Sequence, residues 1–489
     1  MTSLKKNMAY NIAYQVLVIV LPLVTAPYVS RILGAEGLGI YSYNFSIVTY
    51  FGLFGMLGIA NHGNRSIALT KADREKVSQT FINIYVIQLF TTFVALIAYL
   101  LFVTFLFSGN KIVAYIQTII LLSYVLDITW CFFGLEQFAV TVTRNAIIKI
   151  VTVIAIFTLV KHRDDVWIYA FIMAFGMLFS QLYLWFQLHK FVSFKKPQWA
   201  SIKRNIQPIL LLFVPAIAYS IYKLLDKVML GAMTSMAQVG MFDNAEKIIN
   251  IPASLITAFG TVMMPRITTL LASSDNEKIS YLNRISIRYF TLLVVGAAFG
   301  LAGISGVLAP VYFGQEFADS SVLIAGLGFS LIFVTWANVI RTQYLIPQQL
   351  DRPYVISTLI GAAANLAVNL VLIPRFAAIG AMIGTIAAEF TVFFAQLLFV
   401  RRQFPMMRYI VPTLWLFPIG AVMCFAVFEI GHVMGTTITS LVVQLLVGGV
   451  IYLTGSALYL WLVHDEFLMR MLTRLGWKTV SGRHSQKFD

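Results

Sequence analysis

Three charged side chains within one apolar stretch have the types and the spacing to do chemistry. Asp243, Glu246 and Lys247 lie in the stretch 237–263 at positions i, i+3 and i+4, which places them on one face of a helix. Glu246 is about nine residues, or roughly 14 Å, from the start of the stretch, near the middle of a bilayer. A charge costs roughly 2.5–3.5 kcal/mol at the centre of a membrane helix, so we expect these groups to face a polar cavity or a partner.

Other charged residues fall in further apolar stretches and extend this hypothesis. Lys223, Asp226 and Lys227 repeat the arrangement in the stretch 207–232. The basic candidates for contact with an anionic substrate are Arg31, Arg144, Lys149, Lys223, Lys227, Lys247 and Arg341. The acidic candidates for ion coupling are Asp127, Asp226, Asp243, Glu246 and Glu389. The alternative is structural: Asp226–Lys227 or Glu246–Lys247 pairs would hold helices together, and Asp127 and Glu389 would be hydrogen-bonded acids of the core.

Motifs for enzymatic or metal chemistry are missing from the sequence. It has no G-x-x-x-x-G-K-[ST] loop and hence no nucleotide-hydrolysing cassette of its own. The six histidines and the two cysteines, Cys131 and Cys424, show no metal-ligand spacing. The glycine-rich segment 34–39 has no lysine after it, and we interpret it as a tight turn. We therefore predict no catalytic residue, no metal site and no cofactor.

Composition indicates the class of protein that holds these charges. Of the 489 residues, 59% are apolar and 11% are charged, whereas soluble domains are roughly 45–50% apolar and about 25% charged. Because so little polar surface is available, the sequence predicts an all-α polytopic membrane protein. Lys5 and Lys6 precede an apolar stretch that is too long for a signal peptide, and we interpret this stretch as the first span.

Fourteen apolar stretches are long enough to cross a bilayer, which takes about 20 residues. Their approximate bounds are 8–33, 38–61, 81–107, 112–135, 138–160, 166–188, 207–232, 237–263, 285–309, 321–346, 353–373, 377–400, 409–432 and 438–463. An even number puts both termini on one side. Most Lys and Arg outside the stretches fall on that side, so the positive-inside rule predicts cytoplasmic termini. This bias explains the net charge of +15 without a nucleic-acid partner.

A weak internal repeat predicts how the spans are grouped. At an offset of 201 residues, Gly39 aligns with Gly240 and Arg65 with Arg266. We expect two parallel six-helix lobes followed by two C-terminal helices. The expected ranges are 1–205 for the N-lobe with spans 1–6, 206–403 for the C-lobe with spans 7–12, 404–464 for spans 13–14, and 465–489 for a cytoplasmic amphipathic tail that lies on the membrane surface or is solvated.

Prolines interrupt the first span of each predicted lobe. Pro22 and Pro27 lie in the first span and Pro215 in the seventh. A proline removes one backbone N–H and allows a helix to bend. Matched bends at the interface of two lobes are typical of alternating-access carriers, although simple packing kinks would give the same pattern.

Three strings resemble one family of membrane transporters. They are SRILGAEGLGIYSYNFSIVTYFGLFGMLGIANHGNRSIA at 30–68, LDKVMLGAMTSMAQVGMFDNAEKI at 225–248 and NLVLIPRFAAIGAMIGTIAAEF at 369–390. The sequence resembles the bacterial polysaccharide-repeat-unit flippases (Wzx type, for O-antigen, capsule and exopolysaccharide) over essentially its whole length. These belong to the multidrug/oligosaccharidyl-lipid/polysaccharide (MOP) exporter superfamily.

The resemblance implies a V-shaped, two-lobed carrier in the bacterial cytoplasmic membrane. It would move an undecaprenyl-pyrophosphate-linked oligosaccharide from the inner to the outer leaflet by alternating access. A cationic cavity suits a pyrophosphate, since Lys and Arg replace its hydration. The expected partners are this lipid-linked oligosaccharide, membrane lipids and a polysaccharide polymerase, and the carrier is expected to work as a monomer.

Three alternatives differ from this reading in substrate or class. A flippase for lipid II, the peptidoglycan precursor, also fits fourteen spans. An ion-coupled multidrug antiporter of the same superfamily should have an acid-dominated cavity and usually twelve spans. A membrane enzyme such as a polymerase or acyltransferase should have large outer loops with clustered Arg, His and Asp, whereas the outer loops of this sequence are short.

Overall fold

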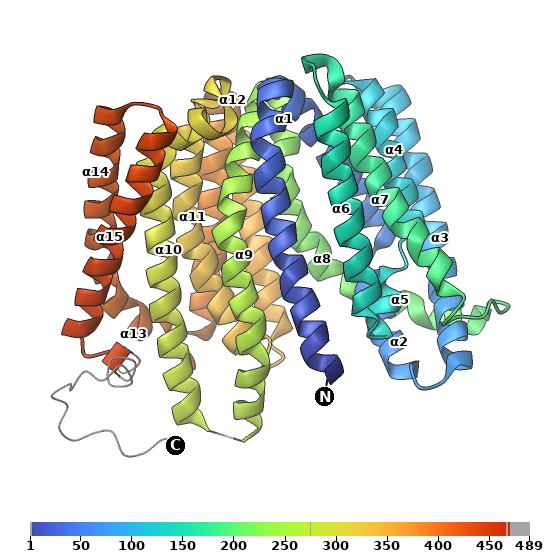
Figure 1. Cartoon of the computed structure of the whole chain (residues 1–489). Helices are drawn as coiled ribbons and strands as arrows, with labels where there is room; N and C mark the ends of the chain where they lie inside the picture. Colours follow the sequence, from blue (N-terminus) through green and yellow to red (C-terminus); the bar gives the residue numbers. More distant parts are fainter. Residues whose placement is uncertain (1, 274, 466–467, 470–489) are drawn as a thin grey trace.

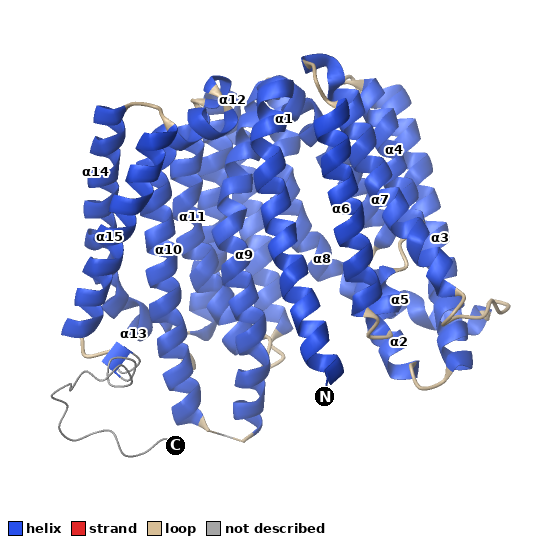
Figure 2. Ribbon diagram, viewed as in Figure 1, coloured by secondary structure: helices blue, strands red, loops and turns tan. Residues whose placement is uncertain are grey.

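The computed structural model describes residues 2–273, 275–465 and 468–469. Only the backbone is described for 2–20, 261–262 and parts of 214–223. Over the described residues the chain is helical and contains no strand (Figure 2). The predicted amphipathic tail at 465–489 lies almost entirely outside these residues.

The helices are long, as the runs of apolar residues predict. The α-helices are α1 Thr2–Met56, α2 Ile59–Thr70, α3 Arg74–Leu101, α4 Lys111–Val125, α5 Thr129–Gly134, α6 Phe138–Leu159, α7 Val166–Leu188, α8 Trp199–Met233, α9 Met236–Ala272, α10 Asn276–Phe313, α11 Ser320–Ile340, α12 Asp351–Val400, α13 Met406–Ile410, α14 Leu416–Met434 and α15 Ile438–Leu462. Short π or 3-10 turns are η1 Phe102–Leu106, η2 Arg163–Asp165, η3 Gln315–Phe317, η4 Arg341–Leu345 and η5 Val411–Trp415.

Two of these elements each contain a sharp break. In α1 the break is at Gly34, with φ 69° and ψ 180°, and in α12 it is at Ala377, with φ 49° and ψ −127°. Glycine adopts positive φ without the steric cost that a side chain brings. The breaks coincide with the predicted limits between spans 8–33 and 38–61 and between spans 353–373 and 377–400. The non-helical residue of α1 is Gly34 rather than Pro22 or Pro27.

Ten helices within the described residues are long and apolar enough to cross a membrane. The count rises to eleven if the bent pair Leu21–Met56 and Ile59–Thr70 is one span. Many of their large apolar side chains face outward, among them Phe90, Phe186 and Phe425, with 70%, 74% and 68% exposed. An aqueous surface would not tolerate so much exposed apolar area, and lipid tails would cover it. The protein is therefore a multi-pass membrane protein.

The helices stand side by side, and α1 begins at the same end of the molecule at which α15 ends (Figure 1). We call this end the terminal face and the other end the opposite face. Helices α1 to α7 form the first half of the chain, and α8 to α15 the second half. Helix α1 packs on α3, α4 and α6 of the first half and on α8, α9 and α10 of the second.

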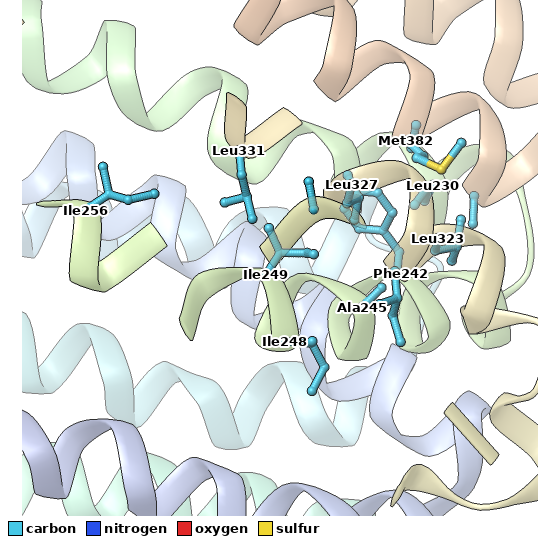
Figure 3. Packing of buried hydrophobic residues seen from close by; sticks show 14 of the residues in the cluster. Leu230, Phe242, Ala245, Ile248, Ile249, Ile256, Leu323, Leu327, Leu331 and Met382 are labelled. Atoms are coloured by element: carbon cyan, nitrogen blue, oxygen red, sulfur yellow. The ribbon is translucent and has the colours of Figure 1, made fainter. Parts of the chain in front are cut away.

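The largest hydrophobic core fixes α9 among its neighbours. Phe242, Ile249 and Ile256 of α9 are packed with Leu327 and Leu331 of α11 (Figure 3). The same cluster includes Val29, Leu33 and Leu38 of α1, so it continues across both halves. Helices α14 and α15 pack separately, against α10. The apolar side chains of α9 thus hold its charged face against α8 and α1.

Candidate functional site

Four charged side chains of α8 and α9 form one connected group, the α8–α9 charge cluster. Lys227 Nζ lies 2.7 Å from Asp243 Oδ1 and 2.8 Å from Glu246 Oε2, and Lys247 Nζ lies 2.8 Å from Asp243 Oδ2. The side chains of Lys227 and Asp243 are only 14% and 12% exposed, whereas that of Lys247 is 35% exposed. Two cations and two carboxylates give the cluster no net charge, so it is balanced rather than cationic.

The observed ion pairs differ from the structural pairs that the sequence suggested. Lys227 pairs with Asp243 and Glu246 rather than with its neighbour Asp226, and Lys247 pairs with Asp243 rather than with Glu246. Adjacent residues of a helix point about 100° apart, so they do not face each other. Partners one turn away or on the facing helix are favoured instead.

Helix α1 contributes two serines to the same site. Ser42 Oγ donates to Asp243 Oδ1 at 2.7 Å, and Asn244 Nδ2 donates to Ser30 Oγ at 2.8 Å. All four of these residues are buried. Sequence reasoning missed both serines, although Ser42 and Asp243 are separated by the 201 residues of the internal repeat.

Asp226 occupies a separate buried site between α8 and the two parts of α12. Its Oδ1 accepts from Asn365 Nδ2 at 3.0 Å and from Asn369 Nδ2 at 2.6 Å, and its Oδ2 accepts from Thr385 Oγ1 at 2.6 Å. Asp226 is 4% exposed. Within the described residues the Oδ1 of Asn369 is buried and accepts no hydrogen bond. Asn365, Asn369 and Thr385 were not predicted as donors to Asp226, because uncharged polar residues within predicted spans 11 and 12 do not indicate which charged residue they contact.

The remaining basic candidates lie apart from the charge cluster. Arg144 is buried in the first half, where it donates to the carbonyl of Ser180 at 3.1 Å and to Asn145 Oδ1. Arg341 donates to Asn338 Oδ1, and its guanidinium lies 6.0 Å from the centre of the Tyr354 ring. Lys149 is half-buried on α6. The side chain of Lys223, like that of Pro215, lies outside the described part of the structure.

Asp127 and Glu389 lie in different settings. Asp127 lies between α4 and α5, where its Oδ1 accepts from the backbone N–H of Thr129 at 2.9 Å. This contact lies at the start of α5, and Asp127 is only partly buried. Glu389 is 4% exposed within α12. The structure therefore brings together Lys227, Asp243, Glu246 and Lys247 in one group of ion pairs.

Helices α1 and α9 cross at a pair of glycines. A Cβ atom on Gly39 would lie 1.7 Å from the carbonyl oxygen of Met236, and one on Gly240 would lie 2.0 Å from that of Ala35. Any other residue would force the two backbones apart. Gly39 and Gly240 are aligned by the offset of 201 residues. The repeat thus relates residues that meet each other where the two halves of the chain cross.

Several polar contacts between the two halves lie at the opposite face. Glu316 accepts from the backbone N–H of Ala35 at 3.0 Å and pairs with Arg163 at 2.9 Å. We call Ala35, Arg163 and Glu316 the opposite-face latch. Close by, Arg31 donates to the carbonyl of Val311 at 2.6 Å, and Tyr312 donates to that of Leu23. The latch residues lie between the predicted spans, so the charges within those spans did not indicate them.

A hydrogen-bonded turn presents Arg163 to Glu316. The backbone N–H groups of Lys161 and His162 donate to Asp165 Oδ2 at 2.7 and 2.8 Å. These bonds lower the pKa of the Asp165 carboxyl below its usual range, because they stabilise the ionised form. Asp165 is therefore ionised at neutral pH and keeps the turn closed.

We expect Glu316→Gln to loosen the latch modestly. Glutamine keeps an oxygen for the Ala35 N–H but loses the charge that pairs with Arg163. Exposed pairs contribute about 0.2–1 kcal/mol, so amide exchange over residues 160–166 should accelerate by at most about fivefold. Hydrogen–deuterium exchange with mass spectrometry measures this. Asp164→Asn, on the same turn, is the control, and equal exchange in both variants would show that the Arg163–Glu316 pair does not hold the turn.

Comparison with solved structures identifies the fold. The fold is similar to that of the lipid II flippase MurJ in an inward closed conformation, with a TM-score of 0.73, 13% identity, and coverage of 94% of this chain and 99% of that one. It is also similar to an inward-facing multidrug resistance MATE transporter of the MOP superfamily, with a TM-score of 0.57, 13% identity, and coverage of 80% and 98%. The chain thus has the fold of MOP-superfamily transporters.

The family follows from the sequence. The chain belongs to the polysaccharide biosynthesis protein family, whose sequence model matches residues 4–271. A relative from Escherichia coli (strain K12), assigned as an O-antigen transporter, is 23% identical over 413 residues, which cover 82% of this chain and 97% of the relative. The resemblance to the polysaccharide-repeat-unit flippases is confirmed.

Proposed function

We propose that this protein is a flippase that moves an undecaprenyl-pyrophosphate-linked oligosaccharide from the inner to the outer leaflet of the bacterial cytoplasmic membrane. The observation that carries the proposal is the α8–α9 charge cluster, which lies where helices of both halves meet, behind a latched opposite face. The family and its O-antigen transporter relative support the lipid-linked oligosaccharide as the substrate class. The basic loops on the terminal face support its assignment to the cytoplasm.

The balanced charges suggest how the site would bind an anion. Lys247 is the more exposed of the two lysines and is held by Asp243 alone among the acids of the cluster. A pyrophosphate carries at least two negative charges and would compete with Asp243 for Lys247 through charge-assisted hydrogen bonds. Lys227, enclosed by Asp243 and Glu246, would keep the carboxylates in place. Arg31, Arg144, Lys149, Lys223 and Arg341 remain proposed contacts along the path.

The architecture of the proposed carrier follows from the breaks in α1 and α12. If each of these elements crosses the membrane twice and α8 crosses it once, the chain has fourteen spans. We infer an N-lobe at 1–205, a C-lobe at 206–403 and two additional spans at 404–464. Contacts of α1 with α9 and of the opposite-face latch would part when the carrier opens outward. Action as a monomer and a polymerase partner stay predictions.

Leaflet crossing in proteoliposomes tests the proposal. A fluorescent undecaprenyl-pyrophosphate oligosaccharide would be added to vesicles that contain the purified protein, and its accessibility in each leaflet would be followed. We expect protein-dependent crossing. Faster crossing of lipid II would favour the peptidoglycan-precursor alternative. Movement of a cationic dye, without crossing of either lipid, would overturn the flippase proposal in favour of an antiporter.

We also propose that Asp226 couples transport to a cation or a proton. Its carboxylate is surrounded by two amides and a hydroxyl, Asn365, Asn369 and Thr385. Each amide has one oxygen and one NH2 group, so a half-turn of either would present oxygen instead of N–H. Carboxylate, amide and hydroxyl oxygens together are ligands for hard cations. Asp243, Glu246, Asp127 and Glu389 are the other proposed acids, and the charge cluster already holds the first two.

Asp226→Asn should uncouple transport from its ion gradient. The substitution keeps the size of the side chain and one acceptor oxygen, but it replaces the other carboxylate oxygen by an NH2 donor and removes the charge. We expect gradient-driven crossing to fall at least about tenfold, since hydrogen bonds to a charged group contribute about 1.5–3 kcal/mol. Crossing would be measured with imposed proton and sodium gradients, beside Asp319→Asn as an exposed control. Unchanged gradient dependence in Asp226→Asn would exclude this role.

A further inference from the structure

A small polar pocket lies at the terminal face where α10 meets the end of α15. It has a volume of about 110 Å³ and is lined by Tyr281, Arg284, Ile285, Arg288, Val463, His464 and Asp465. Its described lining residues include two arginines and a histidine, which give it basic character, and one acid, Asp465. We call it the α10–α15 pocket. It is remote in sequence from the charge cluster and takes no part in the proposed transport.

Buried contacts fix the position of the pocket walls. Asp465, only 3% exposed, forms an ion pair with Arg288 and accepts from the hydroxyl of Tyr289 at 2.8 Å. The guanidinium of Arg284 lies 5.8 Å from the centre of the Tyr281 ring. A guanidinium has five N–H donors in a rigid fork, so an ion pair through one nitrogen of Arg288 does not exhaust its donors.

The turn that follows α15 places His464 at the pocket. His464 has φ 50°, a left-handed conformation that residues with side chains rarely adopt. Its Nδ1 lies 3.2 Å from the carbonyl of Leu462, and Nδ1 must donate because the carbonyl can only accept. Nε2 is therefore the nitrogen through which His464 would meet a bound group. Backbone strain of this kind is retained where the surrounding structure demands it, here by the Asp465–Arg288 pair.

The pocket adjoins a surface that lipid tails would cover. Trp461, Leu462 and Val463, immediately before the turn, are 53%, 61% and 43% exposed. Tryptophan at the end of a span is typical of the membrane interface. A molecule with an anionic head in the pocket could therefore lay its acyl chains along the end of α15. Free phosphate would gain nothing from this neighbouring apolar surface.

We propose that the α10–α15 pocket binds the phosphate of an anionic phospholipid of the terminal-face leaflet. Arg284 and Arg288 supply positive charge and donors, His464 adds a donor at Nε2 when its imidazole is protonated, and Asp465 holds Arg288 in position. Basic pockets between membrane helices on the cytoplasmic side are suited to anionic headgroups. The lipid would fasten α10 to α15 at their ends.

Lipid-dependent thermal stability of the full chain in detergent micelles tests this site. Phosphatidylglycerol, phosphatidylcholine or inorganic phosphate would be titrated into wild type, into the double variant Arg284→Gln/His464→Gln and into Arg402→Gln. Arg402 is an exposed arginine of the same face outside the pocket. The double variant leaves the Arg288–Asp465 pair intact, and unfolding midpoints without lipid report whether it folds.

We expect phosphatidylglycerol to stabilise wild type and Arg402→Gln more than phosphatidylcholine does. The apparent affinity of the double variant for phosphatidylglycerol should be weaker by about tenfold or more, since two charge-assisted contacts are lost. Native mass spectrometry should show one fewer retained phosphatidylglycerol in the double variant. An equal response of all three proteins would overturn the proposal, and stabilisation by inorganic phosphate as strong as that by the lipid would reject a lipid ligand.

Discussion

Lys227→Met is expected to be the most damaging single substitution in the α8–α9 charge cluster. Lys227 contacts both Asp243 and Glu246, and its side chain is only 14% exposed. Removing one partner of a buried ion pair costs about 3–5 kcal/mol; here Glu246 loses its counter-ion among the described residues, and Asp243 keeps only Lys247. We expect a much lower unfolding midpoint and no leaflet crossing. Thermal unfolding in micelles and the proteoliposome assay measure the two effects.

Lys247→Met is the matched comparison for this prediction. Lys247 is 35% exposed, and without it Asp243 still pairs with Lys227. We expect it to change stability by less than about 1 kcal/mol but to weaken substrate binding, since it is the proposed contact for pyrophosphate. Equal loss of stability in both lysine variants would contradict the assignment of a structural role to Lys227 and a binding role to Lys247.

A double substitution tests whether an unpaired charge causes the loss of stability expected in Lys227→Met. Lys227→Met combined with Asp243→Asn removes one charge of each sign, and Glu246 and Lys247 then balance the cluster. The double variant should recover part of the stability that Lys227→Met loses, because the effects of substitutions at interacting residues on the free energy of unfolding are not additive. If the losses of stability in the two single variants simply add in the double variant, Lys227 stabilises the protein through packing of its carbon chain rather than through its charge.

Gly240→Ala is expected to drive the protein away from the conformation described here. Its Cβ would lie 2.0 Å from the carbonyl oxygen of Ala35, a backbone atom that cannot rotate away. Overpacking costs typically 1–3 kcal/mol in a core that can adjust. Here α1 and α9 would have to separate, which favours a state opened at the opposite face. Substrate approach from the terminal face should then be lost, although the variant folds.

Distances across the opposite face would measure this shift. Spin labels at Glu36 and Asp319, exposed positions on the two halves, should report longer distances in Gly240→Ala than in wild type, by double electron–electron resonance. Gly306→Ala is the control, because a Cβ at Gly306 would have no atom within 4 Å. The same distance distribution in all three proteins would exclude the crossing at Gly39 and Gly240 as a determinant of closure.

Patterns among residues close in sequence predict most of the long helices. The apolar stretches predict the long helices, and the limits between adjoining stretches coincide with the breaks at Gly34 and Ala377. The spacing of Asp243 and Lys247 indicates one helical face, and the two residues do form an ion pair. These features depend on residues close in sequence, so helix periodicity and the limits of the apolar stretches indicate them, and glycine preference adds a reason for the break at Gly34 but not for that at Ala377.

Partners from distant segments could not be located in the same way. The sequence suggested Asp226–Lys227 and Glu246–Lys247 as pairs, yet Asp226 is bound by Asn365, Asn369 and Thr385, and Glu246 by Lys227. Helical geometry excludes adjacent residues as partners but does not say which other helix approaches. That choice depends on how α8 packs against α9 and α12.

The sequence by itself determined that this is a helical membrane protein of the polysaccharide-flippase family, with charges buried within its spans. Hydropathy and local motifs suffice for this, because lipid requires that each spanning segment satisfy its own backbone. The tertiary structure alone decided that the cluster is balanced in charge, that Ser42 meets Asp243, and that Glu316 closes the opposite face. These contacts join segments that are far apart along the chain, and only the crossing of the helices brings them within hydrogen-bonding distance.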